Sequence, residues 1–266
     1  MKYFSKIYIA VVFMLLYIPI LVLMLFSFNK TSNTGAFDGF SLYWYRELFN
    51  SPETFTALKN TLILAVSTAV ISTVIGTAAA VGMVKMKSNI LRTAIQSVTN
   101  IPMMNPDIVT GISMMLLFVA IGTFVGLADK LSFWTMLISH VTFCLPYVIL
   151  SVLPRVKAMD KSIPEAAQDL GCTPVQSFFK VELPMIMPGI LSGAILAFTM
   201  SLDDFVISYY TTGSDFQTLP LMIFAMTKKT VKPDMYALSS VIFLTVLVLL
   251  LIVNIGQIKQ DRKNKN

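Results

Sequence analysis

Three aspartates stand out because each lies within a long apolar stretch of the sequence, where charge is rare. They are Asp107, Asp203 and Asp204, and no Lys or Arg lies within the predicted membrane spans. An ionised Asp at the centre of a bilayer costs at least about 2.5–3.5 kcal/mol on insertion scales, so such residues normally face an aqueous cavity or a partner. The chain offers these carboxylates no cation of its own. A cationic substrate passing through would therefore be the missing partner.

Two tyrosines, Tyr209 and Tyr210, follow the acidic pair near the end of its apolar stretch. Ammonium groups bind the faces of aromatic rings with about 0.5–2 kcal/mol each, so both rings are candidates for the same pathway. Tyrosines at a membrane interface also serve purely as anchors, which is the competing interpretation. Because adjacent helical residues point about 100° apart, we expect only one of Asp203 and Asp204 to face a pathway. A hydrated helix end is the alternative explanation for the pair.

Asp107 is predicted to lie near the middle of its apolar stretch, next to Pro106. A proline within a helix removes one hydrogen bond and kinks the helix. The side chain of Asp107 or Asn105 could instead form a hydrogen bond with the backbone group that this kink leaves unpaired. This is the structural alternative to a substrate role. The single histidine, His140, lies in another apolar stretch, and we expect it to make a polar contact between helices.

Other chemistry has little support in the residue pattern. Cys144 and Cys172 fall in different compartments, so we expect no disulfide, and neither has a His or a second Cys at metal-ligand spacing. The sequence contains no G-x-x-x-x-G-K-S/T motif, so the chain is not expected to bind ATP or another cofactor itself. No pairing of a nucleophile with a base indicates an enzyme. We interpret the net charge of +6 as a signal of membrane topology and not of nucleic-acid binding.

The apolar stretches themselves define the fold class. The chain is 56% hydrophobic and 13% charged, whereas soluble domains carry roughly 25% charged residues. A helix of about 20 apolar residues crosses a bilayer and satisfies its own backbone hydrogen bonds. We therefore predict an all-α integral membrane protein that forms a single domain over residues 1–266. Its transmembrane helices, about six in number, are expected at Ile7–Phe28, Thr61–Val84, Val98–Ile121, Phe133–Leu153, Met185–Tyr209 and Tyr236–Ile255.

The distribution of Lys and Arg predicts the orientation of these spans. Most of the 20 basic residues fall at the two chain ends and in the loops at 85–92 and 154–184. The positive-inside rule places those segments, and hence both termini, in the cytoplasm. Lys2 and Lys6 precede the first span as they would a signal peptide, but the apolar part is too long and no cleavage site follows it. We therefore expect the first span to be retained.

The external loop at 29–60 and a small-residue motif have structural interpretations. The aromatic residues in 43–49 favour a helix lying at the membrane interface, and Ser51-Pro52-Glu53 is typical of a helix start. Gly189 and Gly193 form a G-x-x-x-G motif. Such motifs allow close helix packing, which we expect here against a second subunit.

The long internal segment at 154–184 is predicted to form two short helices outside the bilayer. Ser162 can cap the first helix, whose first turn holds Glu165. This helix is expected to stop at Gly171, and Thr173-Pro174 is expected to start the second helix. A polar hairpin between two spans does not cross the membrane itself. We therefore expect the segment to contact a partner in the cytoplasm.

The residues of this hairpin resemble a known family signature, the EAA loop. They are Glu165-Ala166-Ala167, then Gly171, then Val181, Leu183 and Pro184, with Val181 where the family more often has Ile. The EAA loop marks permease subunits of binding-protein-dependent ABC importers, so the resemblance implies a type I importer permease fold. It also implies that this loop, between spans four and five, is a coupling helix that docks on a cytoplasmic ATPase dimer. ATP and Mg would then bind to that ATPase and not to this chain.

Three further stretches look like the second permease subunit of spermidine/putrescine importers. They are Asn105–Phe118, Ser201–Gly213 and Thr218–Met226, and the likeness extends over most of the chain. It implies a multi-pass protein of a prokaryotic cytoplasmic membrane that moves polyamines inward by alternating access. The implied partners are a second permease subunit, the ATPase dimer, an external polyamine-binding protein and lipid. The alternatives are the same machine carrying an amino acid or a metal chelate, and an ion-coupled secondary transporter that uses Asp107.

Overall fold

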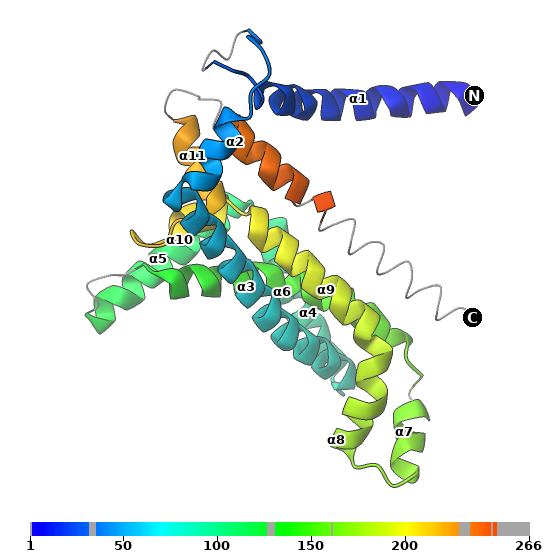
Figure 1. Ribbon diagram of the computed structural model, residues 1–266. Helices are drawn as coiled ribbons and strands as arrows, with labels where there is room; N and C mark the ends of the chain where they lie inside the picture. The colour runs from blue at the N-terminus through cyan, green and yellow to red at the C-terminus, as the bar shows by residue number, and fades with distance from the viewer. Residues whose placement is uncertain are drawn as a thin grey trace. The chain divides into compact units, whose positions relative to one another are not determined.

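The computed structural model describes residues 2–31, 36–126, 131–160, 162–228, 235–245 and 247–248. Within these ranges the backbone forms helices and turns, with one isolated β-bridge between Asn29 and Phe40. The elements, most of them labelled in Figure 1, are α1 (Lys2–Phe26), α2 (Tyr43–Asn50), α3 (Pro52–Lys85), α4 (Asn89–Met104), α5 (Asp107–Val125), α6 (Phe133–Ala158), α7 (Ser162–Asp169), α8 (Pro174–Ser177), the π-helix η1 (Phe178–Glu182), α9 (Leu183–Asp203), α10 (Val206–Thr211) and α11 (Leu219–Thr227).

Five helical segments among the described residues are long and apolar enough to cross a membrane. These segments are Lys6–Phe26, Pro52–Lys85, Asp107–Val125, Phe133–Ala158 and Pro174–Asp203. They confirm the predicted all-α class and five of the predicted spans, although the boundaries of the second, third and fifth spans differ clearly from those predicted. The sixth predicted span, Tyr236–Ile255, begins with the apolar helix Met235–Thr245, and its part beyond residue 248 lies outside the described residues.

The chain divides into two compact units, and each is considered by itself. The first unit contains Met1–Ala57 and Leu221–Asn266, and the second contains Leu58–Pro220. Every residue that the sequence singled out for a functional role lies in the second unit. The expectation of one domain over residues 1–266 stays a prediction.

In the first unit, α2 confirms the helix expected among the aromatic residues of the loop at 29–60. The Tyr45 hydroxyl lies 2.7 Å from Ser27 Oγ, and Trp44 Nε1 donates to the Asn29 carbonyl at 2.9 Å. These bonds connect α2 to the segment that follows α1. Helix α3 begins at Pro52, as the sequence predicts.

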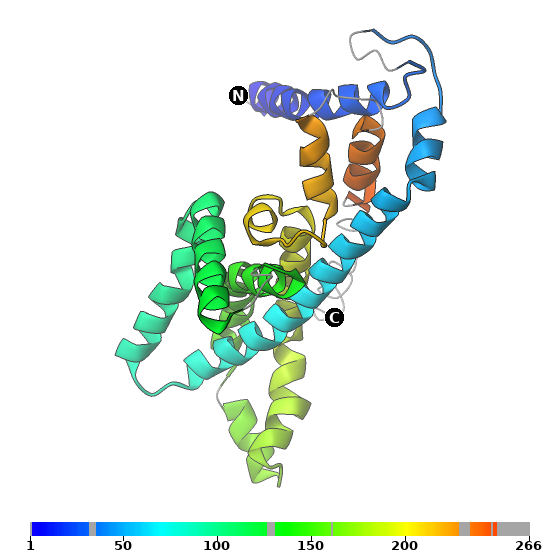
Figure 2. The same ribbon diagram turned by 90° about the vertical axis from the view of Figure 1, so that its left-hand side faces the viewer.

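The predicted third span, Val98–Ile121, is wrong in its boundaries. The chain forms two helices there, α4 and α5, separated by an extended break in which ψ is 140° at Asn105 and 139° at Pro106. Pro106 has no N–H to donate, and its ring disfavours a helical conformation for the residue before it. Only α5 is long and apolar enough to form a span. Figure 2 shows α4 as a separate helix after the turn that ends α3.

The predicted fifth span, Met185–Tyr209, is also wrong in its boundaries. Helix α9 ends at Asp203, and Asp204 has an extended ψ of 127° before α10 begins. At the other end the span is longer than predicted, because α8, η1 and α9 follow one another without a break from Pro174. The second short helix of the hairpin therefore runs directly into the membrane span.

Helix α6 lies at the centre of the second unit. Its buried side chains, such as Val148 and Val152, contribute to a hydrophobic core with residues of α3 and α9. Glycines on those two helices allow the close approach: a Cβ on Gly76 would lie 2.7 Å from Val148 Cγ1, and one on Gly193 would lie 3.2 Å from it. The G-x-x-x-G motif therefore packs α9 against α6 of the same chain. The predicted close helix packing is confirmed, and its partner is α6 of this chain and not a second subunit.

Replacing Gly189 with Val is expected to destabilise the chain by about 1–3 kcal/mol, because overpacking forces the backbone to shift. A Cβ at this position would lie 2.9 Å from the Ser151 carbonyl oxygen, which belongs to the backbone of α6. Denaturant unfolding of the purified chain in detergent measures the change. Gly82→Val is the matched control, because nothing lies within 4 Å of a Cβ built on Gly82. Equal stability of the two variants would contradict the close packing.

Candidate functional site

The hairpin between α6 and α9 turns at Gly171, as the sequence predicts. Gly171 has a φ of +91°, a conformation that an L-residue adopts only with strain. Its N–H donates to the Gln168 carbonyl at 2.9 Å, and the Cys172 N–H donates to the Ala167 carbonyl at 3.1 Å. This pair of bonds is the Schellman pattern, which ends α7 and reverses the chain. Figure 1 shows α7 and α8 on the two arms of the hairpin.

Two caps and one cross-link hold the helices of the hairpin. Asp160 caps α7, because its Oδ1 accepts the Ser162 N–H at 3.0 Å, and this bond lowers the pKa of the Asp160 carboxyl below its usual value. The prediction that Ser162 is itself the cap is corrected, since Ser162 is already helical. Thr173 starts α8 as predicted, with a capping box in which its Oγ1 accepts a backbone N–H at 3.3 Å. Ser177 Oγ donates to the Pro164 carbonyl at 3.2 Å and ties the helices together.

The tip of the hairpin presents an exposed surface. No residue of α7 is buried, and among the predicted coupling residues Glu165, Ala166 and Gly171 are exposed. Three apolar side chains of the hairpin are exposed as well: Leu170 at 88%, Val175 at 65% and Phe179 at 60%. Clustered exposed apolar residues with polar neighbours are typical of a site for a protein partner.

The remaining predicted coupling residues are less exposed or lie away from the tip, and of these only Ala167 belongs to α7. Ala167, Val181 and Leu183 are half-buried, and Pro184 is exposed. Val181 belongs to η1, where the Leu183 N–H donates to the Phe178 carbonyl five residues earlier. This wide turn lies directly before Pro184, whose missing N–H interrupts the α-helical bonding pattern. Val181, Leu183 and Pro184 therefore join the hairpin to α9 and do not form its tip.

An ion pair, which the sequence did not reveal, connects η1, where the hairpin joins α9, to the end of α3. Lys85 Nζ lies 2.9 Å from Glu182 Oε1 and 2.8 Å from Oε2. The Glu182 side chain is 4% exposed, whereas the Lys85 side chain is 55% exposed. The two residues are 97 positions apart in the chain, so no local pattern could show their contact. The only available signal was the position of Glu182 directly before an apolar span. A carboxylate that is buried there requires a partner.

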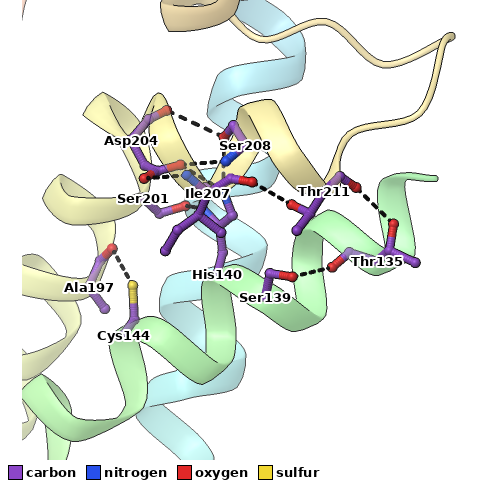
Figure 3. A network of polar contacts seen from close by, with 10 residues as sticks. All are labelled: Thr135, Ser139, His140, Cys144, Ala197, Ser201, Asp204, Ile207, Ser208 and Thr211. Atoms are coloured by element: carbon purple, nitrogen blue, oxygen red, sulfur yellow. Dashed lines mark hydrogen bonds and ion pairs between the residues drawn. The ribbon is translucent and has the colours of Figure 1, made fainter. Parts of the chain in front are cut away.

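Asp204 belongs to a buried polar network, which Figure 3 shows. Its Oδ2 accepts the Ser208 N–H at 2.8 Å and its Oδ1 accepts the Ile207 N–H at 3.3 Å, so the carboxylate caps α10. His140 Nε2, on α6, lies 3.4 Å from the same Oδ2. Asp204 therefore has hydrogen-bonding partners within the chain, while the expectation that the chain offers the carboxylates no cation of its own stays a prediction. The polar contact between helices that we expected of His140 is confirmed.

Asp203 lies at the end of α9, and its residue is exposed, unlike Asp204. The Tyr209 residue on α10 is 46% exposed, and its ring meets the Tyr210 ring edge to face with the centroids 5.3 Å apart. Tyr210 packs closely against α5, because a Cβ on Gly111 would lie 2.9 Å from Tyr210 Cδ2. The expectation that only one residue of the acidic pair is available to a pathway agrees with this arrangement. Contact of Asp203 or the tyrosines with a substrate stays a prediction.

Asp107 is an exposed residue in the first turn of α5, and the prediction that it lies in mid-span is wrong. A carboxylate in a first turn is favoured by the helix dipole.

The fold and the hairpin define the class of this protein as a membrane transport component. Residues 72–266 match the family described as binding-protein-dependent transport system inner membrane component, and the chain belongs to that family. One relative, the putrescine transport system permease protein PotI of Escherichia coli K12, is 38% identical over 230 residues, or 86% of this chain and 82% of the relative. The spermidine/putrescine transport system permease protein PotC of the same strain is 35% identical over 259 residues, or 97% and 95% of the two chains.

Solved structures share the fold. A chain of a bacterial ABC transporter involved in the import of alginate matches with a TM-score of 0.76 and 16% identity, over 97% of this chain and 95% of that chain. A chain of the inward-facing MetNI methionine ABC transporter matches with a TM-score of 0.55 and 15% identity, over 80% of this chain and 98% of that chain. These matches confirm the predicted importer permease fold, and at such low identity they carry no information about the substrate.

Proposed function

We propose that this chain is a permease subunit of an ATP-driven importer that moves polyamines into the cytoplasm. The observation that carries the proposal is the similarity to PotC, which covers 97% of this chain and 95% of the relative. Nearly the whole transport fold of a spermidine/putrescine permease therefore has a counterpart here. The chain itself supplies the pathway and no ATPase site.

The hairpin supplies the coupling to ATP hydrolysis. Its exposed tip, with Glu165, Ala166 and Gly171, docks on a cytoplasmic ATPase dimer that binds ATP and Mg. The helix from Pro174 to Asp203 is unbroken, so a movement at the tip is transmitted along one rod to its far end. Asp203 lies at that end. The same helix thus connects the docking surface to a carboxylate of the substrate pathway.

The pathway attracts polyamines through carboxylate charges and the faces of aromatic rings. Putrescine and spermidine carry several ammonium groups, each of which interacts favourably with a carboxylate or an aromatic face. Asp203, Asp107 and the tyrosines of α10 supply these groups. A second permease subunit completes the pathway, and an external binding protein delivers the amine. The distribution of basic residues supports an inner-membrane location with both termini in the cytoplasm.

Uptake of labelled putrescine and spermidine by proteoliposomes containing the complete complex tests this function. We expect uptake that requires ATP inside the vesicles and loaded binding protein outside. Uptake without ATP would indicate an ion-coupled secondary transporter instead. Competition by an amino acid or a metal chelate would reassign the substrate while keeping the ATP-driven mechanism.

Asp203→Asn is expected to reduce the rate of polyamine uptake about tenfold or more. A hydrogen bond to a charged group contributes about 1.5–3 kcal/mol, and about 1.4 kcal/mol corresponds to a factor of ten. Asp215→Asn is the matched control, because Asp215 is an exposed carboxylate outside the described spans. If Asp203→Asn and Asp107→Asn both leave uptake unchanged, the cation pathway proposed here is refuted.

A further inference from the structure

The network around Asp204 centres on one buried histidine. The His140 residue is 1% exposed, and its ring bonds to residues of two other helical segments. Nδ1 lies 2.8 Å from Ser201 Oγ on α9, and Nε2 lies 3.0 Å from Ser208 Oγ on α10. A single imidazole on α6 therefore connects the end of one helix with the start of the next.

A neutral imidazole satisfies every bond to this ring. The Ser201 hydroxyl can donate to Nδ1, and Nε2–H can donate to Ser208 Oγ. The Ser208 hydroxyl in turn donates to the main-chain carbonyl of Asp204 at 3.3 Å. Fully satisfied buried networks rigidify their surroundings, since any rearrangement leaves polar groups unpaired in a low-dielectric interior. The network therefore favours one arrangement of α6, α9 and α10.

The same network maintains the break between α9 and α10. No Pro or Gly occurs between Ser201 and Tyr210, so the helix contains no backbone-breaking residue at this point. Instead Asp204 adopts an extended ψ of 127°, and its carboxylate accepts the first N–H groups of α10. The break is therefore stabilised by the local cap of Asp204 and by the tertiary contacts of His140, which lies on a different helix.

Helix α10 is held at its other end as well. Thr135 Oγ1 on α6 donates to the Thr211 carbonyl at 2.9 Å, as Figure 3 shows. Asp203 and Tyr209 lie on either side of the break, and both are exposed. Because α6 holds α9 at Ser201 and α10 at both ends, it fixes the directions in which these two side chains leave the backbone.

We propose that His140 is a positioning residue for polyamine passage. By holding Ser201, Ser208 and Asp204 it sets the geometry in which the Asp203 carboxylate and the Tyr209 ring meet the substrate, without touching the substrate itself. This inference rests on the proposed function, in which those exposed groups line the pathway. Asp204 then acts as a support for the pathway and not as one of its binding groups.

The spermidine-to-putrescine preference of the complete complex in proteoliposomes tests the proposal. In His140→Leu we expect the ratio of the two uptake efficiencies (kcat/KM) to shift at least threefold, because the two amines differ in length and charge. Cys144→Ala is the matched control. Cys144 is equally buried one turn further along α6 and donates only to the Ala197 carbonyl, at 3.6 Å. We expect this control to lower the yield of folded complex and to keep the wild-type ratio.

A second measurement follows the accessibility of position 209 and does not depend on transport. Tyr209→Cys, in a chain that also carries Cys172→Ser and Cys144→Ala, is labelled with a cationic thiol reagent that does not cross membranes. We expect the labelling rate to change several-fold when His140→Leu is added. His140→Gln, whose amide can replace one of the two contacts, is expected to bring both the labelling rate and the uptake ratio back toward the wild type.

An unchanged uptake ratio and labelling rate in both His140 variants, with only a lower yield, would overturn the positioning role and leave the proposed function intact. Failure of the wild-type complex to take up either amine would overturn the proposed function instead. If His140→Leu does not assemble, Ser201→Ala and Ser208→Ala decide the question by the same two measurements. Each removes one partner of the imidazole with little change in volume.

Discussion

A complex that carries Gly171→Ala is expected to take up polyamine about 5–30 times more slowly than the wild type. Gly171 has a φ of +91°, where an L-residue costs roughly 1–2 kcal/mol, and this energy corresponds to a factor of about 5–30 in a conformational equilibrium. Nothing lies within 4 Å of a Cβ built on this residue, so the penalty falls on the turn alone. The initial rate of ATP-dependent uptake in proteoliposomes measures the effect.

Gly126→Ala provides the matched control for this turn. Gly126 has a φ of +73° at the end of α5, and nothing lies within 4 Å of its built Cβ either. The substitution therefore introduces a comparable backbone strain far along the chain from the hairpin, and uptake is expected to stay near the wild-type rate. Co-purification of the ATPase should fall only in the Gly171 variant. Equal uptake by both variants would contradict a coupling role for the hairpin turn.

The turn of the hairpin was predictable because its causes are local. A Gly at the end of a short helix, followed by Thr173 and Pro174, contains both the stop and the start signals. The family signature depends on the same few positions. The caps show where local reasoning fails, since Asp160 and Ser162 are both plausible capping residues and only the backbone geometry selects Asp160.

The break before α5 also has a local cause, but the hydropathy of the surrounding residues predicted one continuous span instead. Asn105-Pro106-Asp107 carries a helix stop and a helix start, whereas the apolar residues on either side favour one continuous span. The break after α9 contains no Pro or Gly, and besides the local cap of Asp204 it depends on His140, which is distant in the sequence. The exposure of Asp107 and the burial of the Asp204 side chain could therefore be known only from the tertiary structure.

Lys85→Met is expected to destabilise the chain more than Glu182→Gln, although both substitutions remove the same ion pair. Lys85→Met leaves the Glu182 carboxylate, whose side chain is 4% exposed, without its cation. Breaking a fully buried pair in this way costs about 3–5 kcal/mol, and the 55% exposure of Lys85 places the expected loss below that range. Glu182→Gln keeps the shape and removes the charge. Denaturant unfolding of the purified chain in detergent measures both variants.

The double variant Lys85→Met/Glu182→Gln separates the effect of charge from that of packing. It leaves no charge without a partner, so its free energy of unfolding should exceed that of Lys85→Met, with a coupling energy of about 0.5–3 kcal/mol. Lys87→Met, which alters an exposed Lys two residues further along, should stay within about 0.5 kcal/mol of the wild type. If the double variant is as unstable as Lys85→Met, the buried charge is not the cause.

The position of the ion pair gives this prediction a functional counterpart. Lys85 ends α3, and Glu182 lies in η1, near the foot of the unbroken helix from Pro174 to Asp203. Under the proposed function, this ion pair supports the π turn through which movement of the hairpin reaches α9. Lys85→Met is therefore expected to lower the number of amines moved per ATP hydrolysed. Reduced stability with an unchanged ratio of transport to hydrolysis would show that the pair only stabilises the fold.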